Sequence, residues 1–541
     1  MIPPPVNPST RLARELVEEI VAAGTTDVVL SPGSRNAPLG FAVWEADRAG
    51  ALRLHTRIDE RSAGFLALGL GKAGRPTAVV CTSGTAVANL HPAVLEAAHA
   101  GVPLTLLTAD RPARLRGTGA AQTTDQVGIF GAAARCFDVA AGDDRTDLRK
   151  ALGAPDRPIH INVQLELPLV PDGRWESRAE PALPRRRMIW PTVEPEPIDL
   201  GPRTVVVAGD DAGPAVRRLA EQAGWPLLAE PSSGARTGEH AIRAYRLLLG
   251  TALGAEIQRV VVGGHPTLSR PVTRLLERPD VEVVALPAPG VWRERPFPVR
   301  RHAEALAPQG TADPHWLARW QQADRDLSRR IGRLLAQEGE LTAYQVAATV
   351  SDAVPPGGLL FIGASSPIRD LDLLARPHPV GEHRMYLSNR GLAGIDGTVS
   401  AAIGAALGRP QSTRSFALLG DVTFLHDAGG LVLGPDEPRP DLTLIVVNDD
   451  GGSIFTVLEQ GDPAYAESFD RVFGTPHGVD LAALCAATRT PHWRVESRAE
   501  LEQALASPNG GIEVVEVRVR RDNRRELDAR IRELAQSLTL E

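Results

Sequence analysis

Short apolar runs alternate with helix-length amphipathic segments through the first third of the chain. The pattern predicts helices over residues 11–23 and 60–72, and strands over residues 27–30, 52–57, 78–81 and 103–108. Strands that alternate with helices along a chain are typical of a parallel, doubly wound sheet. We therefore expect the chain to begin with an α/β domain.

The same alternation returns twice further along the chain. A middle part carries predicted strands over 204–208, 259–262 and 281–285, and a polar helix follows from about 316 to 340. A last part carries a glycine-rich helix over 391–408. Its predicted strands cover 359–362, 416–419, 443–447 and 514–519. A proline- and arginine-rich stretch over 168–202 is typical of an interdomain linker. The predicted fold class is α/β, with three doubly wound parallel-sheet domains over residues 1–180, 181–335 and 336–541.

Composition narrows the class of protein. The 541 residues are too many for one hydrophobic core, no apolar run reaches the roughly 18 residues of a membrane span, and no secretory signal is visible at the N-terminus. A net charge of -7 gives no electrostatic case for nucleic acid. Three cysteines without a CxxC pair suit a reducing cytoplasm. Because only Lys72 and Lys150 are lysines, 59 − 2 = 57 basic residues are arginines, so any anion site here must use guanidinium groups.

Acidic residues follow two apolar runs whose spacing suits neighbouring strands. Asp421 follows the run 415–419, and Asp449 and Gly451 follow the run 443–447. The 26 positions over 422–447 leave room for one crossover helix between parallel strands, whose carboxyl ends form the ligand-binding edge of such sheets. We predict that Asp421, Asp449 and the carbonyl of Gly451 bind Mg²⁺, with Mn²⁺ as the alternative metal, beside a phosphate. The competing interpretation is that these are ordinary turn residues.

Other polar side chains also follow predicted strands. Glu60 lies where a strand gives way to a helix, a position that also suits an acidic residue favoured by the helix dipole. Arginines follow four strands, at Arg35, Arg111, Arg369 and Arg390. Any one of them alone is typical of a surface ion pair. Together they predict a substrate with several carboxylates, because a guanidinium group binds a carboxylate through two parallel hydrogen bonds.

Several motifs then match one known family in order along nearly the whole chain. The matching segments are residues 31–38 (SPGSRNAP), 59–61 (DER), 82–86 (TSGTA), 109–112 (ADRP), 388–397 (SNRG to GIDG), 420–421 (GD) and 451–455 (GGSIF). The Gly-Asp pair, separated by 26 residues from Asn448, resembles the general thiamine diphosphate signature. With the SPGSR and SNRG segments added, the chain resembles the 2-succinyl-5-enolpyruvyl-6-hydroxy-3-cyclohexene-1-carboxylate (SEPHCHC) synthases, thiamine diphosphate enzymes of menaquinone biosynthesis.

The resemblance implies a reaction and a set of site residues. It implies a transferase that decarboxylates 2-oxoglutarate and joins the product to isochorismate, with a pyrimidine-binding domain first, a central α/β domain and a diphosphate-binding domain last. Glu60 would be catalytic, against the aminopyrimidine of the cofactor, and Ile395 would be the apolar wedge that keeps the cofactor bent. The cofactor contacts implied by the resemblance are Glu60, Ser83, Gln122, Ile395, Gly420, Asp421 and Ile454. The implied substrate contacts are Ser365, Arg369 and Arg390 for 2-oxoglutarate; Ser34, Arg35, Arg111, Gln122 and Arg270 for isochorismate; and Phe455 in the pocket wall.

This sequence departs from the family pattern at three positions. Asp449 replaces the usual asparagine, so the predicted metal ligand becomes a carboxylate, which Mg²⁺ accepts readily. Ala121 stands where many relatives carry an asparagine, and Ser269 where some carry a lysine, each beside a predicted isochorismate residue. The resemblance further implies a cytoplasmic homodimer or homotetramer.

Two other functions stay open at this point. Another thiamine diphosphate enzyme, such as an acetohydroxyacid synthase, would prefer pyruvate and often carries FAD in its middle domain. The turn over 209–213 lacks the GxGxxG pattern of dinucleotide sites and gives FAD no support. A non-enzymatic nucleotide-binding or regulatory α/β module would require Glu60 and the predicted metal loop to be incidental.

Overall fold

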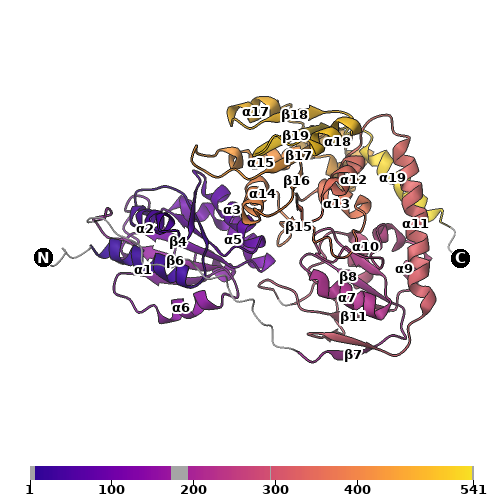
Figure 1. The fold of residues 1–541 in the computed structure, drawn as a ribbon, viewed down its shortest axis with the longest axis horizontal. Helices are drawn as coiled ribbons and strands as arrows, with labels where there is room; N and C mark the ends of the chain where they lie inside the picture. The colour runs from indigo at the N-terminus through magenta and orange to yellow at the C-terminus, as the bar shows by residue number, and fades with distance from the viewer. Residues whose placement is uncertain (1–6, 172–192, 293, 539–541) are drawn as a thin grey trace. The chain divides into compact units, whose positions relative to one another are not determined.

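The computed structural model describes residues 7–171, 193–292 and 294–538 (Figure 1). They form two compact units. The first unit holds residues 7–171 together with Gly391–Gln411 and His426–Pro440, and the second holds 193–390, Ser412–Leu425 and 441–538. Most of the predicted linker, and the predicted boundary near residue 180, lie outside the described residues. The three domain bounds therefore stay a prediction.

The first unit is built on a parallel six-stranded sheet of order β2-β1-β3-β4-β6-β5. Its strands are fully or mostly apolar where both faces are covered, as in Thr77–Cys81, all of whose residues are buried. The strands are β1 (Asp27–Leu30), β2 (Arg53–Thr56), β3 (Thr77–Cys81), β4 (Leu104–Asp110), β5 (Arg135–Val139) and β6 (Ile159–Gln164). The α-helices of this unit are α1 (Pro8–Ala22), α2 (Ala37–Arg48), α3 (Glu60–Lys72), α4 (Thr85–Asn89), α5 (His91–Ala100), α6 (Thr146–Gly153) and α14 (Thr398–Gly408).

Helices α3 and α14 pack closely inside the first unit, although more than 300 residues separate them in sequence (Figure 1). Glycines permit the approach, since a Cβ at Gly69 would lie 2.0 Å from the carbonyl oxygen of Ala401 and one at Gly404 would lie 2.1 Å from that of Leu66. The predicted helix over 391–408 begins only at Thr398, so its first seven residues were assigned wrongly. Gly397 ends that segment with φ +56, a conformation that favours glycine, and a Cβ there would lie 1.9 Å from the ring of Phe65.

The second unit contains two larger sheets. A parallel five-stranded sheet has the order β12-β11-β10-β8-β9 and is built from Arg301–His302, Glu282–Ala285, Arg259–Gly263, Thr204–Ala208 and Leu227–Ala229, beside the two-stranded pair β7 (Glu196–Asp199) and β13 (Leu306–Gln309). The α-helices around it are α7 (Gly213–Ala223), α8 (Tyr245–Leu248), α9 (Ala252–Ala255), α10 (Arg270–Leu276) and α11 (Pro314–Ala336).

The other large sheet of this unit again has six parallel strands, in the order β15-β14-β16-β17-β19-β18. Its strands are β14 (Leu359–Ile362), β15 (Met385–Ser388), β16 (Ser415–Gly420), β17 (Leu442–Asn448), β18 (His492–Val495) and β19 (Ile512–Arg518). Numbered from its own first strand, this order is 2-1-3-4-6-5, the same as in the first unit. Its α-helices are α12 (Ala343–Ala353), α13 (Ser366–Leu374), α15 (Asp421–His426), α16 (Ala466–Phe469), α17 (Leu481–Ala487), α18 (Arg498–Ala506) and α19 (Arg524–Gln536).

The remaining elements are short helical turns. The 3₁₀ turns are η1 (Ala113–Leu115), η2 (Gly131–Ala133), η3 (Ala428–Leu431), η4 (Ser453–Val457), η5 (Glu459–Gly461) and η6 (Pro463–Tyr465), and η7 (Asp470–Gly474) is a π-helical turn.

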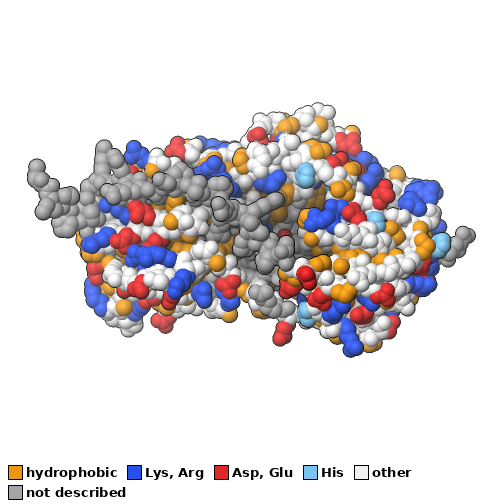
Figure 2. Space-filling model, turned by 60° about the horizontal axis from the view of Figure 1, so that its bottom comes forward, with side chains coloured by type: hydrophobic (Ala, Val, Ile, Leu, Met, Phe, Trp, Pro, Cys, Tyr) orange, Lys and Arg blue, Asp and Glu red, His pale blue; other side chains and the backbone are white. Residues whose placement is uncertain are grey.

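The predicted fold class, α/β, is confirmed. Within the described ranges, the three larger sheets are parallel and are flanked by helices. Strands β16 and β17 are parallel neighbours, as their spacing predicts, and the crossover between them contains the short helix α15. Among the described residues, no helix combines the length and apolar character needed to cross a bilayer. On the face drawn in Figure 2, positive and negative side chains are interspersed among the coloured residues.

Candidate functional site

The carboxyl edge of the first sheet gathers one group of predicted site residues. The chain reverses its direction of strand addition between the neighbours β1 and β3, and such a switch point is where open α/β sheets bind ligands. The loop after β1 and the turn after β3 touch there. A Cβ at Gly33 would lie only 2.4 Å from Cβ of Thr82, so glycine is required for that contact. Ser34, in the same loop, is exposed.

Ser83, Arg111 and Gln122 form a hydrogen-bonded cluster at this edge. Arg111 Nη1 donates to Ser83 Oγ at 2.6 Å and to the Gln122 carbonyl at 2.7 Å. The Gln122 side chain donates in turn to the Ser83 carbonyl at 2.9 Å. Burial and the nearby Arg111 guanidinium lower the pKa of Arg35, so Arg35 belongs to the same positive group. Two like charges held together favour an anionic ligand.

Glu60 is the first residue of α3, at the same end of the sheet. The side chain of Asp59 caps the helix by accepting from the Arg61 backbone N–H at 2.9 Å. Asn89 Nδ2 donates to Asp59 Oδ1 at 3.1 Å and to Glu60 Oε2 at 3.3 Å. The Glu60 charge adds to burial in raising the pKa of Cys81, the last residue of β3. Asn89 therefore orients Glu60, and Asp59 fixes the start of its helix. Asn89 was not identified from the sequence, and Asp59 stood out there only as part of the 59–61 motif.

The predicted metal ligands lie together in the second unit. Gly420 ends β16, and Asp421 begins α15. Asp421 Oδ2 accepts from the backbone N–H of Gly451 at 2.9 Å, which ties the first acidic residue to the loop after β17. Gly451 has φ +140, and a Cβ there would lie 2.1 Å from the carbonyl oxygen of Gly474, so this tight turn requires glycine.

Asp449 is half-buried, and its charge is only partly compensated, by the Ser453 side chain and the charges of Arg524 and Arg521. Burial, and then the nearby carboxylate of Asp421, raise its pKa to about 7. Its Oδ1 has no hydrogen-bond partner among the described residues. Burial also raises the pKa of Asp421. One buried and one half-buried carboxylate, with a turn that carries backbone oxygens, fit a hard divalent cation, which usually takes one or two protein carboxylates together with phosphate oxygens.

Neighbouring residues position this acidic pair. His477 Nε2 lies 3.2 Å from Asp421 Oδ2, and Asp450 Oδ1 accepts from the His477 backbone N–H at 3.2 Å. The amide of Asn448 donates to Glu516 Oε1 at 2.7 Å and is thereby taken up inside the sheet. His477 was not identified from the sequence, where its only signal is its position in a Gly-Thr-Pro-His-Gly turn after the predicted metal loop.

A second set of arginines lies at the carboxyl edge of the last sheet. Ser365 precedes α13 with φ +72, and its carbonyl accepts from Arg369 Nη1 at 2.7 Å. Burial, then the charges of Arg390 and Arg246, lower the pKa of Arg369. Arg390 is only 3% exposed, and its Nη2 donates to Thr267 Oγ1 at 2.9 Å. Three mutually repelling, largely buried guanidinium groups are suited to a dianion.

Buried carboxyls missed by the sequence analysis surround these arginines. Asp372 accepts from the Tyr245 hydroxyl at 2.6 Å and lies near Arg236 and Arg246. Glu230 is buried and accepts from the Leu268 backbone N–H at 3.0 Å. Neither residue follows a recognisable motif in the sequence.

The remaining predicted residues have less defined surroundings. Arg270 is exposed and forms an ion pair with Glu459 at 2.5 Å, which lowers the pKa of Glu459 to about 2. Ile454 and Phe455 are half-buried in the 3₁₀ turn η4, and the Phe455 ring lies 5.7 Å from the Phe473 ring. Ile395 is half-buried just before α14 in the first unit. The structure thus gathers three groups: Arg35, Ser83, Arg111 and Gln122; Asp421, Asp449 and Gly451; and Ser365, Arg369 and Arg390.

Two family models match the chain. The N-terminal TPP binding domain of thiamine pyrophosphate enzymes matches residues 10–129. The C-terminal TPP binding domain of the same enzymes matches residues 373–517. The two matches contain Glu60 and the acidic pair respectively.

Whole-length relatives agree with these matches. A 2-succinyl-5-enolpyruvyl-6-hydroxy-3-cyclohexene-1-carboxylate synthase of Nocardioides sp. is 64% identical over 535 residues, covering 97% of this chain and 98% of the relative. Proteins of the same description from Kineococcus radiotolerans and Nocardia farcinica are 48% and 47% identical, each covering at least 96% of both chains. The chain therefore belongs to the 2-succinyl-5-enolpyruvyl-6-hydroxy-3-cyclohexene-1-carboxylate synthase family of thiamine pyrophosphate enzymes.

Proposed function

We propose that this protein is a transferase that decarboxylates 2-oxoglutarate and adds the remaining four-carbon unit to isochorismate, giving SEPHCHC and CO₂ in menaquinone biosynthesis. When bound, thiamine diphosphate supplies the nucleophilic carbon that a 2-oxo acid needs to lose CO₂. The observation that carries the proposal is the joint presence of an acidic pair, Asp421 and Asp449, and two clusters of arginines at sheet edges.

The acidic pair accounts for the cofactor's diphosphate. Asp421, Asp449 and the Gly451 carbonyl would hold Mg²⁺, with Mn²⁺ as the alternative, and the unpartnered Oδ1 of Asp449 supports a cation there. Gly420 and Ile454 flank the same loop and would contact the cofactor. A cation would offset both the burial and the repulsion from Asp421 that raise the pKa of Asp449.

Glu60 would hold a proton at the pyrimidine end of the cofactor. Glu60 lies at the N-terminus of α3, and the hydrogen bond from Asn89 that orients it supports this assignment. Ser83 and Gln122 would contact the same part of the cofactor, and Ile395 would press against it as an apolar wedge.

The arginine clusters account for the substrates. Ser365, Arg369 and Arg390 would bind 2-oxoglutarate, because buried guanidinium groups bind carboxylates strongly and in a fixed orientation. Ser34, Arg35, Arg111, Gln122 and Arg270 would bind isochorismate, with Phe455 in the pocket wall. Arg270 would exchange its present partner, Glu459, for a substrate carboxylate.

We further propose that the working enzyme is a cytoplasmic homodimer or homotetramer with domains over 1–180, 181–335 and 336–541. A dilute monomer that kept the full specific activity of the concentrated protein would contradict the proposed oligomer.

The decisive experiment offers the purified protein 2-oxoglutarate with isochorismate, or pyruvate with isochorismate, and follows CO₂ release and adduct mass. We expect CO₂ and the SEPHCHC adduct only with 2-oxoglutarate. A preference for pyruvate would favour an acetohydroxyacid synthase-like function instead. Glu60→Gln should lower turnover at least about 100-fold while cofactor binding largely survives, because proton transfer by a positioned side chain contributes on this scale. Unchanged turnover would overturn the role of Glu60.

A further inference from the structure

The segment 391–397 is anchored at its start by one buried carboxylate. Glu96 is only 4% exposed and lies on α5 of the first unit. Its Oε1 accepts from the Gly391 backbone N–H and its Oε2 from the Leu392 backbone N–H, each at 2.7 Å. Both carboxylate oxygens are thus committed to consecutive backbone donors, and such charge-assisted hydrogen bonds are stronger than neutral ones.

The same contact is also fixed by close packing. A Cβ at Gly391 would lie 2.6 Å from the Glu96 carbonyl oxygen and 2.8 Å from the backbone nitrogen of Ala100. The segment therefore lies directly on α5, at a distance that only glycine permits. The carboxylate and this close approach together hold Gly391 at this place, because a residue with a Cβ would not fit there.

The other end of the segment is anchored on α3. Gly397 lies against the ring of Phe65, five residues after Glu60 on that helix. Between the two anchors, the carbonyl of Ile395 accepts from Thr398 Oγ1 at 2.8 Å. Ile395 therefore lies in a short arch, residues 391–397, whose two ends contact α5 and α3. A displacement of the end at Gly391 along α5 would therefore move Ile395 relative to α3, the helix that carries Glu60.

We propose that Glu96 is a positioning residue of the thiamine diphosphate site, which holds the 391–397 arch in register so that Ile395 meets the cofactor. This inference rests on the proposed function, since it assigns Ile395 to the cofactor. Glu96 itself touches neither cofactor nor substrate. Its contribution is to keep the arch from sampling other positions, a form of pre-organisation that lowers the cost of binding.

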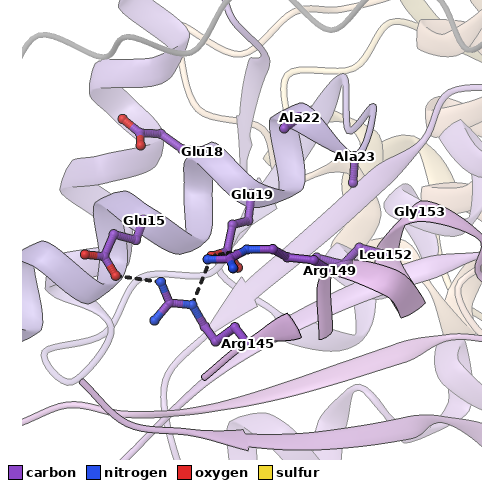
Figure 3. Close-up of a pocket in the computed structure, with 9 residues that line it drawn as sticks. All are labelled: Glu15, Glu18, Glu19, Ala22, Ala23, Arg145, Arg149, Leu152 and Gly153. Atoms are coloured by element: carbon purple, nitrogen blue, oxygen red, sulfur yellow. Dashed lines mark hydrogen bonds and ion pairs between the residues drawn. The ribbon is translucent and has the colours of Figure 1, made fainter. Parts of the chain in front are cut away.

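The test compares Glu96→Gln with a matched control, Glu19→Gln. Glutamine keeps the shape of Glu96 but turns an amide donor toward one of the two backbone N–H groups. Glu19 is likewise a glutamate on a helix of the first unit with a largely buried side chain, and it pairs with Arg145 and Arg149 beside an open pocket of about 630 Å³ (Figure 3). Loss of the Glu19 ion pairs should affect folding alone.

Affinity for thiamine diphosphate is measured by calorimetry at saturating Mg²⁺, and the near-ultraviolet circular dichroism of the bound cofactor is recorded. We expect Glu96→Gln to bind at least about tenfold more weakly, which corresponds to about 1.4 kcal/mol, and to alter the dichroism of the bound cofactor. Glu19→Gln should leave both unchanged. Gly391→Ala, which displaces the two donors but keeps the carboxylate, should reproduce the weaker binding.

Each other outcome counts against the inference. Wild-type affinity and dichroism in Glu96→Gln would overturn it, and so would a Glu96→Gln protein that does not fold, because Glu96 would then be needed for the fold itself. Equal losses in Glu96→Gln and Glu19→Gln would show a general effect of stability. If the unaltered protein failed to bind thiamine diphosphate, the proposed function would fail first, which distinguishes the two.

Discussion

The two six-stranded sheets share one strand order but place opposite charges at matching positions. Both run 2-1-3-4-6-5 with all strands parallel. The first residue after the fourth strand is Arg111 in the first unit and Asp449 in the second. The turn after the third strand carries Ser83 in one and Asp421 in the other. Topology thus determines where a ligand binds, and the residues just beyond each strand determine which ligand it is.

The two matching residues also differ in how well they are satisfied within the chain. Arg111 donates to Ser83 and to the Gln122 carbonyl, so its charge already has partners. Asp449 has a buried oxygen without a partner among the described residues, and burial, then the nearby Asp421 carboxylate, raises its pKa to about 7. The first edge is therefore complete as a polar surface, whereas the second requires a cation to become so.

The largest effect is expected from replacing the acidic residues of the second unit. Asp421→Ala and Asp449→Ala should each weaken Mg²⁺-dependent binding of thiamine diphosphate by more than about 100-fold, since even residues that only support metal ligands contribute 10- to 100-fold. Calorimetry with and without Mg²⁺ measures this loss. Arg111→Ala, at the matching position of the other sheet, is the comparison and should reduce cofactor affinity far less, since Arg111 reaches the cofactor contacts Ser83 and Gln122 only through hydrogen bonds. Metal-dependent binding that survived in Asp449→Ala would exclude Asp449 as a ligand.

Replacing Arg111, the basic residue of the comparison, should affect one substrate rather than the metal. Arg111→Ala should lower kcat/KM for isochorismate by about 10- to 100-fold, because a hydrogen bond to a charged group contributes about 1.5–3 kcal/mol. KM for 2-oxoglutarate should stay unchanged, as should the metal requirement. Steady-state rates with each substrate varied in turn provide the measurement. If both KM values rose together, Arg111 would support the general shape of the edge rather than one substrate.

A buried carboxyl beside the arginines of the second unit should make stability depend on pH. Burial raises the pKa of Glu230 from its ordinary 4.5 to about 8, so the folded protein favours the protonated form. Its contribution to stability is then fully present below pH 4.5 and is lost as pH rises toward 8, by at most about 1.4 kcal/mol per pH unit.

Glu230→Gln should remove this dependence. The melting temperature of the unaltered protein, relative to that of Glu230→Gln, should fall steadily from pH 5 to pH 8. Glu256→Gln is the matched control, because the Glu256 pKa is lowered by its hydrogen bond from Arg319, so no change is expected in that range. Parallel melting curves for Glu230→Gln and the unaltered protein would show that Glu230 is ionised in the fold.

Much of the fold was predictable because buried parallel strands are short apolar runs. The runs 204–208 and 359–362 are strands within the predicted bounds. Strands β5 (Arg135–Val139) and β18 (His492–Val495) were missed, since both are edge strands whose burial is incomplete and whose sequence mixes polar with apolar residues. The segment 391–397 resembled a helix because its glycines serve close approach to Phe65 and α5, a tertiary contact that leaves no periodic pattern.

The candidate site was predictable where a side chain belongs to a motif at a strand end. Asp421, Asp449 and Arg111 are of this kind, and the structure places them at the sheet edges that their spacing predicts. Glu96 and Glu230 were not found. Each acts on backbone N–H groups of a segment distant in sequence, and such partners are set by packing alone.

The smallest expected effect concerns one backbone conformation that the two units share. Gly84 before α4 has φ +80 and ψ -130, and Ser365 before α13 has φ +72 and ψ -135. A glycine adopts this conformation freely, whereas a serine is strained in it by about 1–3 kcal/mol. The strain suggests that the second unit keeps a side chain there for its ligand. Ser365→Gly should therefore be more stable than Ser365→Ala by about 1 kcal/mol, because alanine keeps the strain and glycine relieves it. Both variants should raise KM for 2-oxoglutarate in steady-state assays, since both lack the hydroxyl. Equal melting temperatures for the two would mean that the loop relaxes around alanine, and the serine would then need no functional explanation.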